Sequence, residues 1–96
     1  MNRVAFENYL RDYRRPNGEH LTGTAIDTRL RKAVEAEDVL GHSLDDSVRN
    51  DEQMREDLIT LRTNNGAERR YGQMQNALRK YYHMVHGRQF PQLRYL

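Results

Sequence analysis

Cysteine and tryptophan are both absent from this 96-residue chain, and proline occurs only twice. Without cysteine the chain can form neither a disulfide nor a thiolate metal site, which fits a reducing compartment. Long hydrophobic runs are missing too: no stretch approaches the roughly 18 apolar residues of a membrane-spanning helix. No apolar run follows Arg3, as it would in a signal peptide. The sequence therefore predicts a soluble protein of the cytoplasm.

Motifs that mark common enzyme and cofactor sites are missing as well. The chain has no glycine-rich phosphate loop, no serine or cysteine nucleophile motif and no dinucleotide fingerprint. His83 and His86 have a spacing that can hold a metal, but no cysteine or carboxylate in the same helix completes the set. Four carboxylates could form an acid pair, yet the helix dipole favours each of them at an expected helix start. They are Asp45, Asp46, Asp51 and Glu52. We predict no enzymatic activity, no cofactor and no metal.

The supply of apolar residues fits a small helical core. Apolar residues make up 36% of the chain, charged residues 31%, and mean hydropathy is −1.05. This is enough to bury one stripe on each helix. No alternating run rich in valine, isoleucine and threonine predicts a strand, and no repeat is present. We expect one all-α domain over residues 1–96, with helices at 2–15, 24–40, 51–63 and 66–86, a short connector helix at 44–49 and an extended tail at 87–96.

Capping and stop residues set these boundaries. A polar side chain that begins a helix accepts a hydrogen bond from a free amide of the first turn, and a polar side chain three residues later reaches back. This pairing is predicted for Thr24 with Asp27, Ser43 with Asp46, Asn50 with Gln53 and Asn65 with Glu68. The expected stops are Pro16, Gly41 and Gly87.

Apolar residues recur every three or four positions in each expected helix, and this periodicity predicts the core. The predicted stripes are Phe6, Tyr9, Leu10 and Tyr13; Ile26, Leu30, Ala33, Val34 and Leu40; Met54, Leu58, Ile59 and Leu61; and Tyr71, Met74, Leu78, Tyr81 and Val85. Because Tyr81 and Tyr82 are adjacent, we expect one to face the core and the other the rim. In the tail, Phe90, Leu93 and Leu96 are expected to fold back over the core.

Charge is distributed unevenly along the chain. The net charge is +2, but residues 1–34 carry +3, residues 35–61 carry −7 and residues 62–96 carry +6. Arginine supplies nearly all of the positive charge, since Lys32 and Lys80 are the only lysines. Arginine suits bidentate contact with phosphates and base edges, which favours a nucleic-acid partner. A GC-rich coding sequence would produce the same bias.

Two basic clusters form the candidate nucleic-acid site. One is the polar face of the last expected helix, where arginine and lysine would neutralise phosphates while Gln73 and Asn76 read adenine edges in a major groove. The other is the first half of the second expected helix. The candidate residues are Thr24, Thr28, Arg29, Arg31, Lys32, Arg69, Arg70, Gln73, Asn76, Lys80 and His83. The interpretation requires the fold to bring the two clusters to one side; the alternative is a solvated surface.

Three segments carry a resemblance to a known family: Phe6-Glu7-Asn8-Tyr9-Leu10, Leu21-Thr22-Gly23-Thr24-Ala25 and Ala77-Leu78-Arg79-Lys80-Tyr81-Tyr82. Together they resemble the helical core-binding domain that precedes the catalytic domain of tyrosine recombinases and phage integrases. Similar modules precede the nuclease domains of restriction-type and mobile-element proteins. The resemblance implies a SAM-like orthogonal bundle of four helices that grips double-stranded DNA with its second and last helices. In that family catalysis needs a separate domain, so this bundle would be a non-catalytic targeting module.

A function of another class stays open at this point. The acidic band of residues 35–57 could bind a basic protein surface while Phe90–Leu96 docks a partner or a second copy of the chain. Such an adaptor or inhibitor would not bind DNA, and its complex would depend on acidic residues of the band. They are Glu37, Asp38, Asp45 and Asp46.

Overall fold

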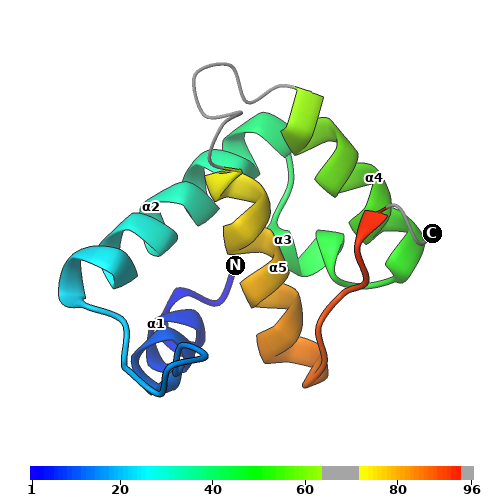
Figure 1. Ribbon diagram of the computed structural model, residues 1–96. Helices are drawn as coiled ribbons and strands as arrows, with labels where there is room; N and C mark the ends of the chain where they lie inside the picture. Colours follow the sequence, from blue (N-terminus) through cyan, green and yellow to red (C-terminus); the bar gives the residue numbers. More distant parts are fainter. Residues whose placement is uncertain (64–71, 94–96) are drawn as a thin grey trace.

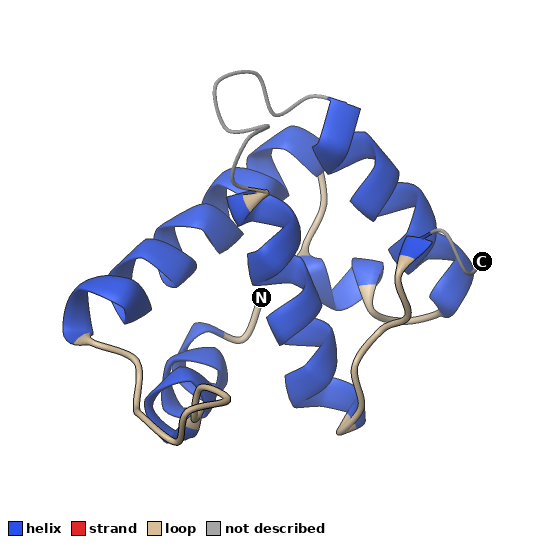
Figure 2. Ribbon diagram, in the orientation of Figure 1, coloured by secondary structure: helices blue, strands red, loops and turns tan. Residues whose placement is uncertain are grey.

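The computed structural model describes residues 1–63 and 72–93 of the chain (Figure 1). Its helices are α1 (Arg3–Asp12), α2 (Gly23–Leu40), α3 (Leu44–Ser47), α4 (Asp51–Thr63) and α5 (Gln73–His86). The described residues form no strand (Figure 2), and Arg14 and His20 pair only in an isolated β-bridge. The all-α prediction is confirmed, as is the short helix between the second and third long helices. Within the described ranges, no helix is long and apolar enough to cross a membrane.

Helix α5 occupies the centre of the molecule (Figure 1). The other helices gather around it, α1 and α2 to one side and α3 and α4 to the other. The last residues of the described chain run back alongside α5. This arrangement leaves one long side of α5 facing outward between the α1–α2 loop and the tail.

The predicted stripes supply most of the core. Each of the four long helices contributes buried apolar residues to one cluster, which α3 and the tail complete. The buried cluster comprises Phe6, Leu10, Ile26, Leu30, Ala33, Ala36, Leu44, Val48, Met54, Leu58, Leu61, Met74, Ala77, Leu78, Tyr81, Tyr82 and Phe90. Tyr9, Leu40 and Leu93 are partly buried against it. Tyr71 and Leu96 lie outside the described residues.

Two predicted core residues are wrong. Val34 is 37% exposed because it lies at the edge of the α2 stripe, whose centre follows Leu30 and Ala33. Val85 is 48% exposed because the last turn of α5 directs a different side chain toward its neighbours. There His86 Nε2 lies 2.7 Å from the carbonyl oxygen of Val48.

The prediction that only one of the paired tyrosines is buried is also wrong. Tyr81 and Tyr82 are 1% and 0% exposed. Both can be buried because each hydroxyl donates a hydrogen bond to a carboxylate: Tyr81 to Asp45 and Tyr82 to Asp51, the latter at 2.8 Å. A buried tyrosine needs such a partner.

Helix α1 ends and helix α2 begins at other residues than expected, whereas α2 ends at Leu40 before Gly41 as predicted. Helix α1 stops at Asp12, three residues before the predicted end, because the chain turns back on itself. The amide of Arg15 donates to the carbonyl of Glu19 at 2.8 Å, and Pro16 lies in that turn. Helix α2 starts at Gly23, with Thr22 as its cap: the Thr22 hydroxyl accepts a hydrogen bond from the Ala25 amide at 3.1 Å. The predicted capping role of Thr24 is therefore wrong.

Helix α5 begins later than the predicted helix at 66–86. Gly72 has φ 58° and ψ 34°, a left-handed conformation that ends helical geometry, so α5 begins at Gln73. The predicted cap, Asn65 with Glu68, lies outside the described residues. Of the other predicted caps, Asn50 accepts from the Gln53 amide at 2.8 Å and Ser43 from the Asp45 amide at 3.1 Å.

The tail is attached to α5 by a basic side chain. Arg79 Nη1 donates to the carbonyl oxygen of Phe90 at 2.8 Å and to that of Pro91 at 3.2 Å. The Phe90 ring, 4% exposed, packs edge-on against Tyr82 with centroids 5.1 Å apart. The expected return of Phe90 to the core is confirmed. This return places the tail along the outward side of α5.

Candidate nucleic-acid interface

The outward side of α5 is the floor of a groove. Three adjoining hollows make it up: one beside the α1–α2 loop, one at its centre and one beside the end of α4. The first two share Tyr13 and Lys80, and the last two share Arg79 and Gln92. Because the hollows share walls, they form one continuous depression. We call it the basic groove, defined by Arg15, Arg29, Arg62, Arg79 and Lys80.

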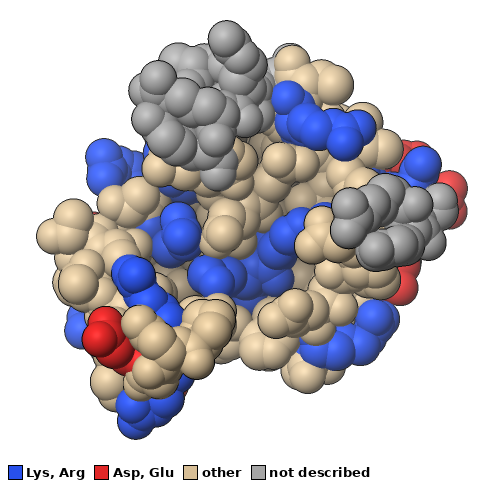
Figure 3. All heavy atoms as spheres, viewed as in Figure 1, with Lys and Arg blue, Asp and Glu red and all other residues tan. Residues whose placement is uncertain are grey.

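The charge of the groove has one sign. No aspartate or glutamate is among the described residues that line any of its three hollows. Figure 3 shows the same asymmetry: basic side chains occupy the central depression of this face, and acidic ones appear toward its edges. Within the described chain, Arg15, Arg29, Arg62 and Lys80 form no ion pair with a carboxylate. Their charges are uncompensated on this face.

The energetic cost of placing these cations together without a carboxylate is clearest at Arg29, a residue of α2. Burial of the guanidinium, followed by the positive charge of Arg15, lowers the pKa of Arg29 from its ordinary value. Its Nε atom is buried and has no hydrogen-bond partner. A half-buried cation beside a second cation, with no carboxylate, is unfavourable unless an anion approaches. A phosphate that binds the accessible part of the guanidinium would offset the repulsion between Arg29 and Arg15.

The cations on α5 are held by neighbouring groups in the groove. The ammonium of Lys80 lies 3.9 Å from the centroid of the Tyr13 ring, a cation–π contact that leaves its charge without a counter-ion. Arg79 is half-buried, which lowers the pKa of its guanidinium, and its guanidinium donates a hydrogen bond to the backbone of the tail. Lys80 is thus free to reorient toward a ligand, whereas Arg79 also has a structural role.

Two polar side chains complete the centre of the groove. Asn76 lies on the floor, and its buried Oδ1 atom has no hydrogen-bond partner. His83 Nδ1 lies 2.6 Å from the hydroxyl of Tyr9. Burial raises the pKa of Tyr9 to about 12, so this hydroxyl keeps its proton near neutral pH. The hydrogen-bonded Tyr9 and His83 side chains thus line the central hollow beside the cations.

The structure brings together four of the predicted site residues. Arg29 from α2 meets Lys80 from α5 in one hollow, and Asn76 and His83 line the next. The condition that the two clusters lie on one side is met for these residues.

Other predicted residues do not line the groove. Arg31 is exposed and donates to Thr28 at 3.4 Å, and Lys32 pairs with Glu35 at 2.8 Å. Thr24 and Gln73, near the starts of α2 and α5, are also absent from its lining. Arg31 misses the groove because two residues along a helix correspond to roughly 200° of rotation from Arg29. Arg69 and Arg70 lie outside the described residues.

Sequence reasoning missed Arg15, Arg62 and Gln92 as groove residues. Arg15 and Gln92 lie in the α1–α2 loop and in the tail, where helical periodicity gives no direction to a side chain, and Arg62 lies in the last turn of α4, whose neighbours depend on the tertiary fold. One signal was available for Arg79: it directly follows the buried Leu78, at the margin of the apolar stripe. A cation at that margin is half-buried, as long basic side chains often are.

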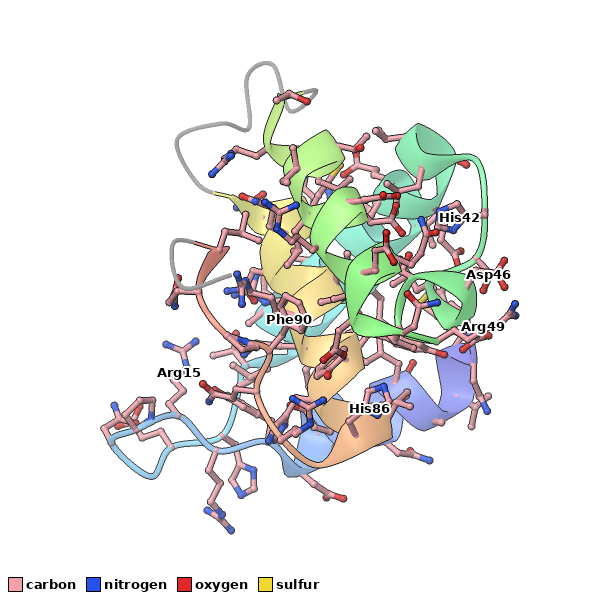
Figure 4. The ribbon with its side chains drawn as sticks, turned by 90° about the vertical axis from the view of Figure 1, so that its right-hand side faces the viewer. Arg15, His42, Asp46, Arg49, His86 and Phe90 are labelled. Carbon is pink, nitrogen blue, oxygen red and sulfur yellow. The ribbon has the colours of Figure 1, made fainter. Side chains whose placement is uncertain are left out.

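Several carboxylates of the acidic segment form ion pairs within the protein. Glu37 and Asp45 lie 3.0 and 3.4 Å from the amino group of Met1, and Asp46 pairs with Arg49 at 2.6 Å. Asp57 is 5% exposed and lies 3.2 Å from Nε2 of His42. In Figure 4, Asp46 and Arg15 lie at opposite edges of the view. These four carboxylates thus have partners within the protein, and none of them lines the groove.

The two histidines of α5 do not converge on a metal position. His83 bonds to Tyr9, and His86 approaches a backbone carbonyl next to α3 while its ring lies 4.3 Å from that of Tyr82. No group of three or more potential metal ligands exists among residues 1–63 and 72–93.

The chain was compared with protein families, curated proteins and solved structures. No family model matches it, and no curated protein or solved structure is similar enough to count as a match. Conclusions about its function therefore rest on the basic groove.

Proposed function

We propose that this protein is a non-catalytic DNA-binding module whose basic groove holds the sugar–phosphate backbone. The observation that carries the proposal is the convergence of five cations from four segments of the chain with no carboxylate in the lining. Such a surface attracts a polyanion, and each neutralised phosphate releases condensed counterions. The arginine bias of the composition fits phosphate contact, because the guanidinium binds phosphate oxygens bidentately.

The groove changes the expected binding geometry. Helix α5 forms the floor of a depression, between walls built by Tyr13 on one side and Gln92 on the other. A helix recessed in this way does not insert into a major groove as a recognition helix does. We therefore propose that a DNA strand enters the protein, with Lys80 and Arg29 as phosphate contacts. Sequence-specific reading of adenine by Gln73 is not part of this proposal.

A protein-binding role is less well supported. Three of the four acidic residues on which that adaptor would depend already have partners within the molecule: Glu37, Asp45 and Asp46. Phe90 is buried and anchored, so this residue of the tail is not available for docking. The resemblance to core-binding domains agrees with the DNA proposal and would make the module serve a separate catalytic domain.

The proposal is tested by titrating a 20-base-pair duplex with the protein at several salt concentrations. Arg29→Gln combined with Lys80→Gln should weaken binding and reduce the magnitude of the salt slope by about 1.8, since each phosphate contact contributes about 0.9. The matched control is Arg3→Gln with Arg55→Gln, which removes the same charge from exposed arginines outside the groove. Equal effects of the two double variants, or no binding by the unmodified protein, would refute the proposal.

A further inference from the structure

The central hollow of the groove differs from its neighbours in shape and lining. Its volume is about 170 Å³. That is several times the roughly 30 Å³ share of a water molecule and well below the roughly 300 Å³ at which pockets for drug-sized ligands begin. The hollow therefore has room for one flat group of a few rings or fewer. It lies directly between the cations at the two ends of the groove.

Ring and amide groups surround this space. Tyr13 stands on one wall and Phe90 on the other, and Asn76, Gln89 and Gln92 supply side-chain amides. The Asn76 side chain makes no hydrogen bond with the described residues, and its Oδ1 atom is buried. Amide groups pair with the donors and acceptors of a base edge, and aromatic rings stack on a base face. A phosphate group has neither a base edge nor a ring face, so these amides and rings are not needed for phosphate binding.

The contact between Lys80 and Tyr13 links this hollow to the phosphate contacts. In the structure the Lys80 ammonium covers the ring of Tyr13 at 3.9 Å from its centroid. A phosphate in the groove would draw the ammonium away, because a full negative charge attracts it more strongly than the ring does. The ring face so uncovered lies in the wall of the hollow and becomes available for stacking.

We infer that the central hollow binds one unpaired DNA base, so that the preferred ligand is DNA with a base outside the helical stack. This inference rests on the proposed function. The flanking phosphates occupy the Arg15–Arg29 end and the Arg62 end of the groove, while the base stacks on Tyr13 and its edge faces the side-chain amides of Asn76, Gln89 and Gln92. A paired base cannot enter, because its edge and both faces are already occupied within the duplex.

Three versions of one fluorescent 20-base-pair duplex test the inference: fully paired, with a single bulged thymidine, and with a single bulged abasic nucleotide. The abasic bulge keeps the extra phosphate and the local flexibility but lacks the base. The thymidine bulge should bind about tenfold more tightly than either of the others, since stacking of one base is worth about that factor. Tyr13→Leu should bring the ratio of thymidine-bulge affinity to abasic-bulge affinity to about one, even if it also changes binding of all three duplexes, whereas Tyr13→Phe, which keeps the ring, should retain the ratio.

The outcomes separate the inference from the proposed function. Equal affinity for the thymidine and abasic bulges would overturn the base pocket while leaving backbone binding intact. An advantage that survives in Tyr13→Leu would also overturn it. Failure of all three duplexes to bind would refute the proposed function itself. Circular dichroism of each variant confirms that the helices are retained.

Discussion

Tyr81 joins three segments that are distant in the sequence. Its hydroxyl donates to Asp45 at the start of α3 and accepts from the backbone amide of Asn2 at 2.8 Å. Its ring meets that of Phe6 edge-on, with centroids 5.2 Å apart. The hydrogen bond from Tyr81 is the largest cause of the lowered pKa of Asp45. One side chain thus connects the beginning of the chain, α1 and α3 to the central helix.

This connection predicts an acid-sensitive contribution to stability. Because the pKa of folded Asp45 lies below the ordinary 3.8, its ionised form stabilises the fold above that value, and the contribution is lost as pH falls through the folded pKa. Tyr81→Phe should reduce the free energy of unfolding by about 1 kcal/mol near neutral pH. Urea denaturation of the wild type, Tyr81→Phe, Asp45→Asn and the double variant measures the coupling between the two side chains. A coupling that is as large well below pH 3.8 as at neutral pH would contradict the assignment.

At the scale of single elements, the two threonines at the start of α2 provide a matched pair. Thr22 and Thr24 are both exposed, but only Thr22 accepts an amide hydrogen bond. Starting the helix at Gly23 adds the hydrogen bond from the Ile26 amide to the Thr22 carbonyl at 3.0 Å. Either threonine could accept such a bond, and this additional backbone bond is a reason for the chain to use Thr22.

Thr22→Ala should therefore lower the free energy of unfolding by about 1 kcal/mol, the usual cost of losing a helix cap. Thr24→Ala should change it by less than about 0.5 kcal/mol, because an exposed side chain without such a bond contributes little. Urea denaturation curves of the two variants give both values. The reverse order would restore Thr24 as the cap.

Helices and buried stripes were predictable from the sequence because they depend on local periodicity. Leu30, Leu58 and Leu78 repeat the spacing of a helix and lie in the core as expected. The failures occur where a tertiary contact decides the outcome. Val85 has the right spacing, but its turn of α5 packs through Tyr82 and His86. No local pattern indicates which side of a terminal turn will meet a neighbour.

At the scale of the whole molecule, the candidate site combines segments whose proximity no local pattern reveals. The charge pattern indicated which regions are basic, and the structure places Arg29 and Lys80 of those regions in one hollow. It could not indicate Arg15, Arg62 or the aromatic walls, because their places in the groove depend on the turn after α1, the packing of α4 and the return of the tail. The negative band, suggestive of a binding surface in the sequence, is instead partnered within the molecule at residues such as Glu37 and Asp57.

The separation of charge across the molecule predicts how affinity should respond to salt. The protein measures 30 × 28 × 25 Å, whereas charges are screened beyond about 8 Å at 0.15 M salt and about 30 Å at 0.01 M. Glu52 and Glu56 are exposed on α4 and do not line the groove. Glu52→Gln with Glu56→Gln should leave duplex affinity nearly unchanged at 0.15 M salt but strengthen it roughly twofold or more at 0.01 M, where their repulsion reaches the DNA. Arg29→Gln with Lys80→Gln should weaken binding at both salt concentrations, because in the proposed complex those side chains contact the DNA directly. Fluorescence anisotropy at the two salt concentrations distinguishes the long-range electrostatic effect of α4 from direct contact in the groove. If the α4 variant altered affinity at 0.15 M as much as the groove variant, DNA would have to lie against α4 and not in the basic groove.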